Sequence, residues 1–442
     1  METAPKSQMN VSTFPVEKLG WLLIFIMAVF LAFAIYPSAQ LDNDMSRFAA
    51  IESLVERGTW IIDESPFLMK PPRGKRPATP IVDRVVMEGH SYSTKPPVMT
   101  FLMAGEYWLL KNLFGLDFSD ESERPILVWI LTFTFVALPF LGIAWFFLKS
   151  GPRFIDNPLL LMTGLIILLF GNQLWGFSRT LNNHVPSGFF LFFSMVQAVS
   201  LVHGKIQPRP YHFIFIGLCT GLLPTFDLPG LFFCAPLFFY LFYFFPKQTL
   251  SWFLLGAIPP LALHFALTWS ITGDFIPIYM KKELYHYKGS YWDKMGGFDA
   301  LEEPKWLYFF HLSIGRKGLF SLFPVLVLPL VGFCRSFVKQ DGCPLKWEMR
   351  TLVFLTAFWM LFYTLQTNNY GGMCYGFRWF MFFTPALAFF SILAMKNFLT
   401  GWRWIFLCLL IAVSCYSGWQ CSLDPWTANE EWTTRFLGKW TF

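Results

Sequence analysis

The chain has 442 residues, of which 55% are hydrophobic, 20% aromatic and only 14% charged. A soluble globular protein carries about 25% charged residues, so this composition argues against a soluble enzyme, and its hydrophobicity excludes a disordered chain. The net charge of +6 includes no long basic run, so no nucleic-acid-binding arm is expected.

Eleven apolar runs are predicted to be membrane-spanning helices. A helix needs about 20 mostly apolar residues to cross a bilayer, and some of these runs are shorter or contain proline. The first run is longer than the apolar core of a signal peptide, so we expect it to remain as the first span. The runs cover residues 19–37, 126–148, 158–174, 185–202, 211–225, 228–245, 250–271, 319–334, 351–366, 379–395 and 403–419.

A further run at 97–115 carries Glu106 and Lys111 and is either a span or a helix on the membrane surface. If it does not cross and the N-terminus is cytoplasmic, the connecting loops rich in Lys and Arg fall on the inner side, as the positive-inside rule requires. If it crossed, this bias would invert. We therefore predict an all-α polytopic membrane protein, one domain over 1–442, with eleven spans, an internal N-terminus and a juxtamembrane helix at 97–115.

This topology places two large segments, 38–125 and 272–318, on the outer side, together with short loops at 175–184, 224–227 and 367–378. Most of the polar residues that could take part in catalysis or ligand binding lie in these segments. The second large segment mixes Tyr, Trp and Gly with charges, which suits a surface that faces a carbohydrate or an acceptor.

Two aspartates, Asp42 and Asp44, follow the first span. Apolar residues such as Phe48 and Ile51 recur at helical spacing, so Asp44 is predicted near the start of a short amphipathic helix that ends at Gly58. On spacing alone, a helix cap is the favoured interpretation of Asp44. The alternative is a general base held at the membrane surface.

Residues 85–93 predict a small hairpin or turn that leads into Lys95, Pro96 and Pro97. The prolines stiffen the entry to the next helix, and Pro97 suits its first turn. Lys95 would then lie at the bilayer surface, where it either meets a lipid phosphate or serves as a snorkelling anchor.

These motifs resemble the first periplasmic loop of the GT-C glycosyltransferases. The nearest branch contains the lipid A aminoarabinose transferases and the protein O-mannosyltransferases, where the motif is close to Asp-Glu-x-Arg-Tyr-Ala, then Gly-Asp-Trp, then Tyr-x-x-Lys-Pro-Pro. The resemblance covers residues 40–110. Its matching residues are an acidic residue after the first span, then 47–49 (Arg-Phe-Ala), 57–60 (Arg-Gly-Thr-Trp) and 92–97 (Tyr-Ser-Thr-Lys-Pro-Pro).

The resemblance implies a GT-C fold with juxtamembrane helices in the first outer loop, a polyprenyl-phosphate-linked sugar as donor, and catalysis on the outer face. Asp44 matches the catalytic aspartate, Arg47 the arginine three positions on, and Lys95 the lysine associated with the donor phosphate. Two positions depart from the pattern. Met45 replaces a second acidic residue, and Thr94 replaces the acid that often precedes the lysine, which leaves a divalent metal ion in doubt.

Two more residues of this segment are candidates. Asp42 is a second catalytic candidate, because it could compensate for Met45. Tyr92 opens the lysine motif and is grouped with Arg47 and Lys95 as a donor-binding residue.

Asn182, Asn183 and His184 lie together in the second outer loop. An amide–amide–imidazole cluster at a membrane boundary can hydrogen-bond sugar hydroxyls. The alternative is that Asn183 or Ser187 only caps the following helix, with Pro186 near its first turn.

Four other polar residues border predicted spans on the outer side. For Asp227, which precedes a Leu-Pro pair, a helix cap is favoured over a site role. Arg316 and Lys317 oppose the positive-inside bias, so they either bind a lipid phosphate or anchor to headgroups. Arg378 stands at the mouth of a span, where an unpaired cation is costly, and is a further phosphate-binding candidate.

The leading functional hypothesis is a glycosyltransferase. It moves a sugar from a polyprenyl-phosphate donor to a lipid, glycan or protein acceptor at the outer face of the plasma (inner) membrane, by a single inverting displacement. A transporter or flippase is the second hypothesis, but most spans lack mid-membrane charge and no internal repeat is found. A ligase of lipid-linked glycans would share the topology without predicting the first-loop motif.

The expected partners are the donor, the acceptor and membrane lipids, without nucleic acid. No cofactor is certain, since no outer histidine has a second ligand at metal spacing.

Overall fold

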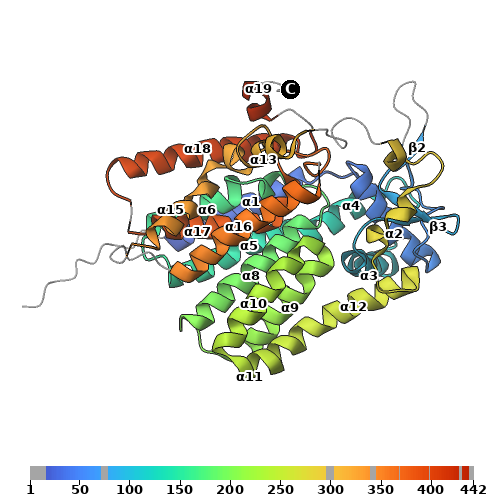
Figure 1. The fold of residues 1–442 in the computed structure, drawn as a ribbon. Coiled ribbons are helices and arrows are strands. Elements are labelled where there is room, and N and C mark those ends of the chain that lie inside the picture. Colours follow the sequence, from blue (N-terminus) through green and yellow to red (C-terminus); the bar gives the residue numbers. More distant parts are fainter. Residues whose placement is uncertain are drawn as a thin grey trace, which may run out of the picture.

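A bundle of apolar helices carries a smaller polar cap at one end (Figure 1). The computed structural model describes residues 16–70, 78–294, 303–338, 345–367, 369–397, 399–427 and 431–437. The bundle is built from α1 (Val16–Ala34), α4 (Arg124–Thr132), η1 (Phe133–Ala137), α5 (Leu138–Ser150), α6 (Pro158–Phe170), α8 (His184–Val202), α9 (Pro210–Phe226), α10 (Leu231–Phe244), η4 (Thr249–Phe253), α12 (Leu254–Thr272), α14 (Leu319–Leu322), η9 (Pro324–Val327), α15 (Leu328–Arg335), α16 (Lys346–Gln366), η10 (Arg378–Phe383), α17 (Thr384–Met395) and α18 (Trp402–Leu423).

All eleven predicted runs coincide with helices of this bundle. Within the described residues, six helical stretches are long and apolar enough to cross a membrane, and four shorter apolar helices accompany them. The one remaining run, 351–366, corresponds to α16, whose first turns carry charged residues. The predicted all-α membrane fold is therefore confirmed.

The polar cap at one end of the bundle is formed by the two large segments between spans, 38–125 and 272–318. Trp292 of the second segment donates its indole N–H to the carbonyl of Val82 in the first, at 3.0 Å. The elements of the polar cap are α2 (Asp42–Arg57), β1 (Met69–Lys70), β2 (Thr79–Pro80), β3 (Arg84–Met87), β4 (His90–Ser93), α3 (Pro97–Phe114), η5 (Ile278–Met280), η6 (Lys282–Tyr285) and η7 (Tyr291–Lys294). Three short helices lie at the ends of spans, namely α7 (Leu174–Phe177), α13 (Lys305–Ser313) and α19 (Trp432–Leu437).

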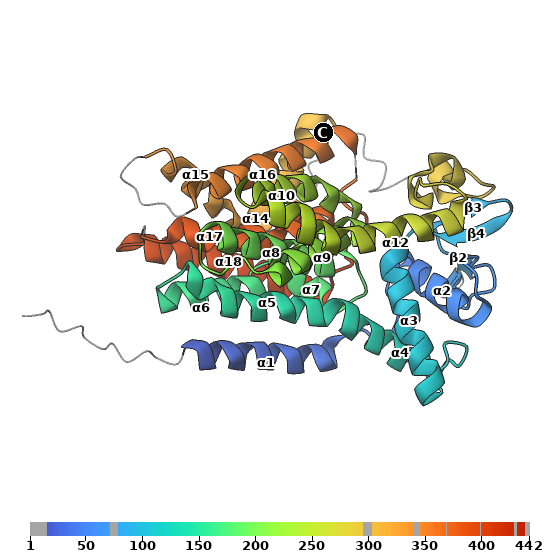
Figure 2. The same cartoon turned by 90° about the horizontal axis from the view of Figure 1, so that it is seen from below.

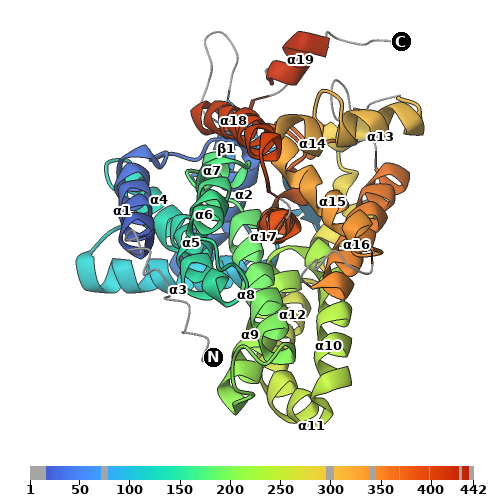
Figure 3. The same ribbon diagram turned by 90° about the vertical axis from the view of Figure 1, so that its left-hand side faces the viewer.

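Helix α3 is the element formed by the ambiguous run at 97–115. It runs across the common direction of α1, α5 and α12 at the cap end of the bundle (Figure 2), and the view along the bundle agrees (Figure 3). This is the orientation expected of a helix that lies along a membrane surface. The direction of α3 supports the predicted topology, whose sidedness stays a prediction.

Helix α2 has the predicted start and end. Its apolar face, including Phe48 and Ile51, is fully buried, and Gly58 ends it with a φ of 64°, in the left-handed region that favours glycine. The predicted hairpin is also present. Strands β3 and β4 pair antiparallel around a two-residue turn in which Glu88 and Gly89 both have positive φ.

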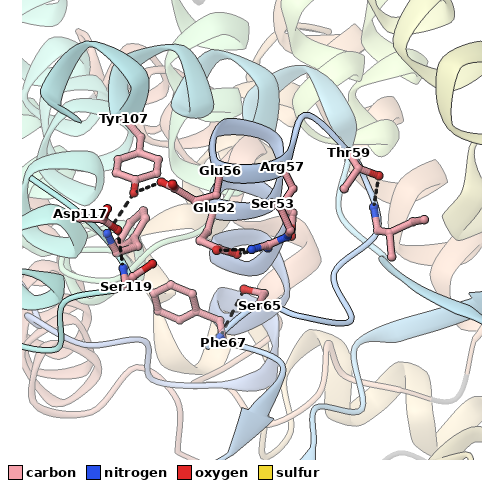
Figure 4. A network of polar contacts seen from close by, with 12 residues as sticks. Glu52, Ser53, Glu56, Arg57, Thr59, Ser65, Phe67, Tyr107, Asp117 and Ser119 are labelled. Atoms are coloured by element: carbon pink, nitrogen blue, oxygen red, sulfur yellow. Dashed lines mark hydrogen bonds and ion pairs between the residues drawn. The ribbon is translucent and has the colours of Figure 1, made fainter. Parts of the chain in front are cut away.

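A polar network fastens α2 to α3 and to the chain before α4 (Figure 4). The Tyr107 hydroxyl donates to Glu56 at 2.5 Å and accepts the N–H of Phe118 at 3.0 Å. Lys111 forms ion pairs with Glu56 and Asp117. Because these groups are partly or fully buried, each one needs its partner, so the network fixes the position of α2 and of the aspartates at its start.

Candidate functional site

A cavity of about 580 Å³ opens where the polar cap meets the ends of the spans. Four predicted residues line it, namely Lys95, Asn183, His184 and Arg378. They come from the first outer segment, the start of α8 and the start of η10, so the fold gathers residues that are nearly 300 positions apart in the sequence.

Lys95 and Arg378 give this cavity positive charge. Lys95 pairs with Asp83 at 3.3 Å and is 10% exposed. Burial lowers the pKa of Lys95, an effect that Asp83 opposes and Arg378 reinforces. The Nε atom of Arg378 is buried and has no hydrogen-bond partner among the described residues, while its guanidinium lies over the ring of Trp426 at 5.2 Å. A buried donor without a partner is costly and marks a place for an anionic ligand.

Asp44 is 1% exposed and does not line the cavity, although the preceding residue, Asn43, does. Its Oδ2 accepts the N–H of Gln40 at 3.0 Å and the hydroxyl of Thr180 at 3.2 Å, whereas its Oδ1 has no partner among the described residues. Burial raises the pKa of Asp44 to about 7, against the opposing effects of these two bonds and of the nearby Lys95 and Arg378. The N-cap of α2 is Leu41 and has no side-chain cap, so the expected helix cap at Asp44 is wrong; its bond to Gln40 reaches the chain before the helix.

Arg47 is 1% exposed, and it interacts electrostatically with this aspartate without a hydrogen bond between the two side chains. Its Nη1 donates to Thr100 at 3.4 Å, and its Nη2 has no partner among the described residues. Burial lowers the pKa of Arg47 to about 10, while Asp44 and Asp227 oppose that effect. Arg47 therefore adds a third cation to this region, and like Arg378 it has a nitrogen without a partner among the described residues.

His184 and Asp227 form a buried pair in the cavity wall. The Nδ1 of His184, the first residue of α8, lies 2.5 Å from Oδ2 of Asp227, the residue that follows α9. The carboxylate of Asp227 makes no capping bond to the following turn. The expected helix cap at Asp227 is therefore wrong, because the side chain turns to the imidazole across the interface of α8 and α9.

The cap of α8 comes from Asn182. Its Oδ1 accepts the N–H of Val185 at 3.0 Å, and its Nδ2 donates to the carbonyls of Phe177 and Thr180. Neither Asn183 nor Ser187 provides a side-chain cap, so the alternative that named them is wrong. The amide of Asn183 is thereby left to face the cavity.

Several residues of the cavity were not singled out in the sequence. Asp83 was missed because its partner Lys95 lies across the β3–β4 hairpin. The aromatic residues of the second outer segment were predicted only as a group, and the hydroxyl of Tyr279 is buried there without a partner among the described residues. The further lining residues are Lys282, Tyr285, His286, Trp292, Tyr363 and Trp379.

Four further predicted residues, like Asp44, Arg47 and Asn182, lie outside the lining of this cavity. Asp42 accepts bonds from Lys70 and from the N–H of Val82, and so holds the first segment together. Tyr92 lies in β4 beside a much smaller pocket. Arg316 pairs with Glu303, and Lys317 pairs with Glu431, so both cations already have carboxylate partners. Among the described residues, no cluster of His, Cys, Asp and Glu could hold a metal ion.

No protein-family model and no curated protein matches the chain. Solved structures similar to it include two of ArnT from Cupriavidus metallidurans. The apo state has 13% sequence identity and a TM-score of 0.50, and the state bound to undecaprenyl phosphate has 14% identity and a TM-score of 0.52. Each match covers 91% of this chain, which spans 64% of the ArnT chain. The chain therefore has the GT-C fold of these membrane proteins.

Proposed function

We propose that the protein transfers a sugar from a polyprenyl-phosphate-linked donor to a lipid, glycan or protein acceptor, at this cavity and on the outer face of the membrane. The observation that carries the proposal is the pair of cations, Lys95 and Arg378, that line one cavity together with aromatic residues. The undecaprenyl phosphate bound by the ArnT structure of the same fold supports a donor of this class.

The chemistry of such a transfer explains why buried cations are needed. As the bond between the sugar and the phosphate breaks, negative charge grows on the leaving polyprenyl phosphate. Cations fixed in a poorly solvated site stabilise that charge more in the transition state than in the ground state. Arg378 offers a nitrogen without a partner, and Lys95 is held ready by Asp83.

The acceptor hydroxyl attacks the anomeric carbon and must lose its proton, and a single displacement inverts the configuration there. The sequence-based prediction assigns this proton to Asp44. Its unpartnered Oδ1 and its pKa of about 7 support that assignment, because a group with a pKa near the working pH is an effective base.

Release of polyprenyl phosphate by purified protein tests the proposal. We expect Lys95→Ala and Arg378→Ala each to lower turnover by about 10²-fold, the size of effect seen when a direct transition-state contact is lost. Lys149→Ala is the matched control, since Lys149 pairs with Glu17 away from the cavity. Wild-type turnover in both cavity variants would contradict the proposal.

Arg316→Ala tests whether Arg316 binds the donor phosphate, as the sequence suggested. Because Arg316 already pairs with Glu303 outside the cavity, we expect its loss to lower thermal stability more than turnover. A 10²-fold fall in turnover at unchanged stability would instead support its predicted role at the phosphate.

A further inference from the structure

Four histidines in the described part of the chain pair with a carboxylate, and one pair differs from the others in burial. The side chains of His184 and Asp227 are 8% and 6% exposed. In the other three pairs, the histidines are 37% to 62% exposed, and they are His90 with Asp63, His203 with Glu348 and His286 with Asp293.

Burial makes the geometry of the His184–Asp227 pair chemically specific. An ionised carboxylate only accepts hydrogen bonds, so Nδ1 of the neutral imidazole carries the proton and donates it to Asp227. The lone pair is then on Nε2, which no described residue hydrogen-bonds. His184 also lines the cavity, so a ligand there can reach this nitrogen.

Asp44 has a different relation to the same cavity. It is buried and does not line the cavity, and its charge acts on Lys95 and Arg378, the two cations expected to hold the leaving phosphate. In an inverting displacement the acceptor approaches from the side opposite the leaving group. The carboxylate of Asp44 is buried and does not line the cavity, whereas His184 does, so His184 is better placed to meet an acceptor bound there.

We propose that His184 is the catalytic residue that accepts the proton of the acceptor hydroxyl, and that Asp227 is its positioning residue. This inference rests on the proposed function and changes one assignment within it. Asp44 then acts by its charge on Lys95 and Arg378.

The step balances without any further reactant. The acceptor O–H bond breaks, its proton goes to Nε2 of His184, and its electron pair forms the new bond to the anomeric carbon. The bond from that carbon to the phosphate oxygen breaks, and its electron pair leaves with the polyprenyl phosphate. The imidazolium returns its proton to water in the cavity.

Chemical rescue separates a base from a structural histidine. We expect His184→Ala to lower transfer by about 10² to 10⁴-fold, the usual contribution of general base catalysis. Added imidazole should raise the transfer rate of His184→Ala at least tenfold, because the shortened side chain leaves room for the imidazole. Binding of undecaprenyl phosphate should stay within twofold of wild type. His90→Ala is the matched control, as it breaks an exposed pair outside the cavity and should change neither rate nor imidazole response.

Variants of Asp227 test the positioning role. Asp227→Asn keeps the shape but favours the wrong tautomer of His184, so kcat should fall at nearly unchanged KM. Asp227→Glu keeps the carboxylate and should recover part of kcat. If His184→Ala misfolds, His184→Gln replaces it, with folding checked by its melting temperature and by undecaprenyl phosphate binding.

Three results would overturn the inference. The first is an active His184→Ala or His184→Gln protein. The second is a folded but inactive His184→Ala that imidazole fails to rescue. The third is that imidazole instead rescues Asp44→Asn or an inactive His286→Ala. Failure of the proposed function looks different, because the wild-type protein would then release no polyprenyl phosphate from any lipid-linked sugar.

Discussion

Asp44 occupies an unfavourable position for a carboxylate, since it is buried with one oxygen unsatisfied and a pKa raised to about 7. Proteins tolerate such a cost mainly at functional sites. We expect Asp44→Asn to lower transfer by about 10²-fold or more, because the neutral amide cannot balance the charges of Lys95 and Arg378. The measurement is kcat/KM for donor turnover.

Asp42→Asn is the control for that substitution. Asp42 lies two residues away on α2, and its carboxylate is bonded to Lys70 and to the N–H of Val82. Its loss should weaken the first outer segment without removing a group from the cavity. A fall in transfer that is larger for Asp42→Asn than for Asp44→Asn would reverse the assignment of the two aspartates.

The raised pKa of Asp44 also predicts how stability depends on pH. The folded-state value is about 7 and the ordinary value is 3.8, so ionisation of Asp44 disfavours the fold. The contribution of Asp44 to the stability of the fold is fully favourable below pH 4 and is lost as the pH rises through 7. Asp44→Asn should therefore melt higher than wild type at pH 8, with the gap shrinking towards pH 5. Equal melting temperatures at both pH values would show that Asp44 stays charged without cost.

Residue types near the site could be predicted from the sequence, but their partners could not. Lys95, His184 and Arg378 were identified from motifs and membrane borders, and all three line the cavity. Asp227 was expected to cap a helix because local spacing favours the nearest backbone N–H. Its actual partner, His184, is 43 residues away, and only the packing of α8 on α9 brings the two together.

At the scale of elements, the polar network between α2 and α3 is a positioning device for the site (Figure 4). Tyr107→Phe removes the hydroxyl that Glu56 and the N–H of Phe118 both use. A buried group left without its partner costs about 1–3 kcal/mol, so the variant should unfold at a lower temperature.

Tyr416→Phe provides the comparison for this substitution. Tyr416 is 47% exposed, and among the described residues its hydroxyl bonds only the side chain of Gln420. Loss of this hydroxyl should change stability by less than about 0.5 kcal/mol. An equal effect of the two substitutions would mean that the network does not hold α2 in place.

Helices α9 and α12 approach each other through glycines. A Cβ atom on Gly256 would lie 2.0 Å from the carbonyl oxygen of Ile214, which no rotamer change can relieve. Gly256→Ala should therefore separate the helices and lower the melting temperature. Gly105→Ala on α3 meets nothing within 4 Å and should stabilise slightly, since alanine is the better helix former. A harmless Gly256→Ala would show that the two helices are less tightly packed.

The helices were predictable because a long apolar run has few alternatives inside a membrane. The ambiguous run at 97–115 was resolved by loop charge, and the direction of α3 agrees with that prediction (Figure 2). The second outer segment was not predictable in detail, because its short turns η5, η6 and η7 depend on contacts with the first segment, such as that of Trp292 with Val82.

At the scale of the whole molecule, the predicted orientation puts the cavity outside the cell membrane. In a variant without its native cysteines, Lys288→Cys in the second outer segment should react with an impermeant thiol reagent in intact cells. Lys205→Cys, between α8 and α9, should resist it. Both side chains are exposed, so burial does not explain a difference. The reverse pattern of labelling would invert the topology.

The central claim is that the cavity of Lys95 and Arg378 cleaves a sugar from a polyprenyl phosphate. The most direct test incubates the purified protein with a panel of polyprenyl-phosphate-linked sugars and candidate acceptors, and measures the polyprenyl phosphate that is released. We predict acceptor-dependent release from at least one donor by the wild-type protein, and about 10²-fold less by Lys95→Ala or Arg378→Ala. No release from any donor, or equal release by the wild type and both variants, would contradict the account.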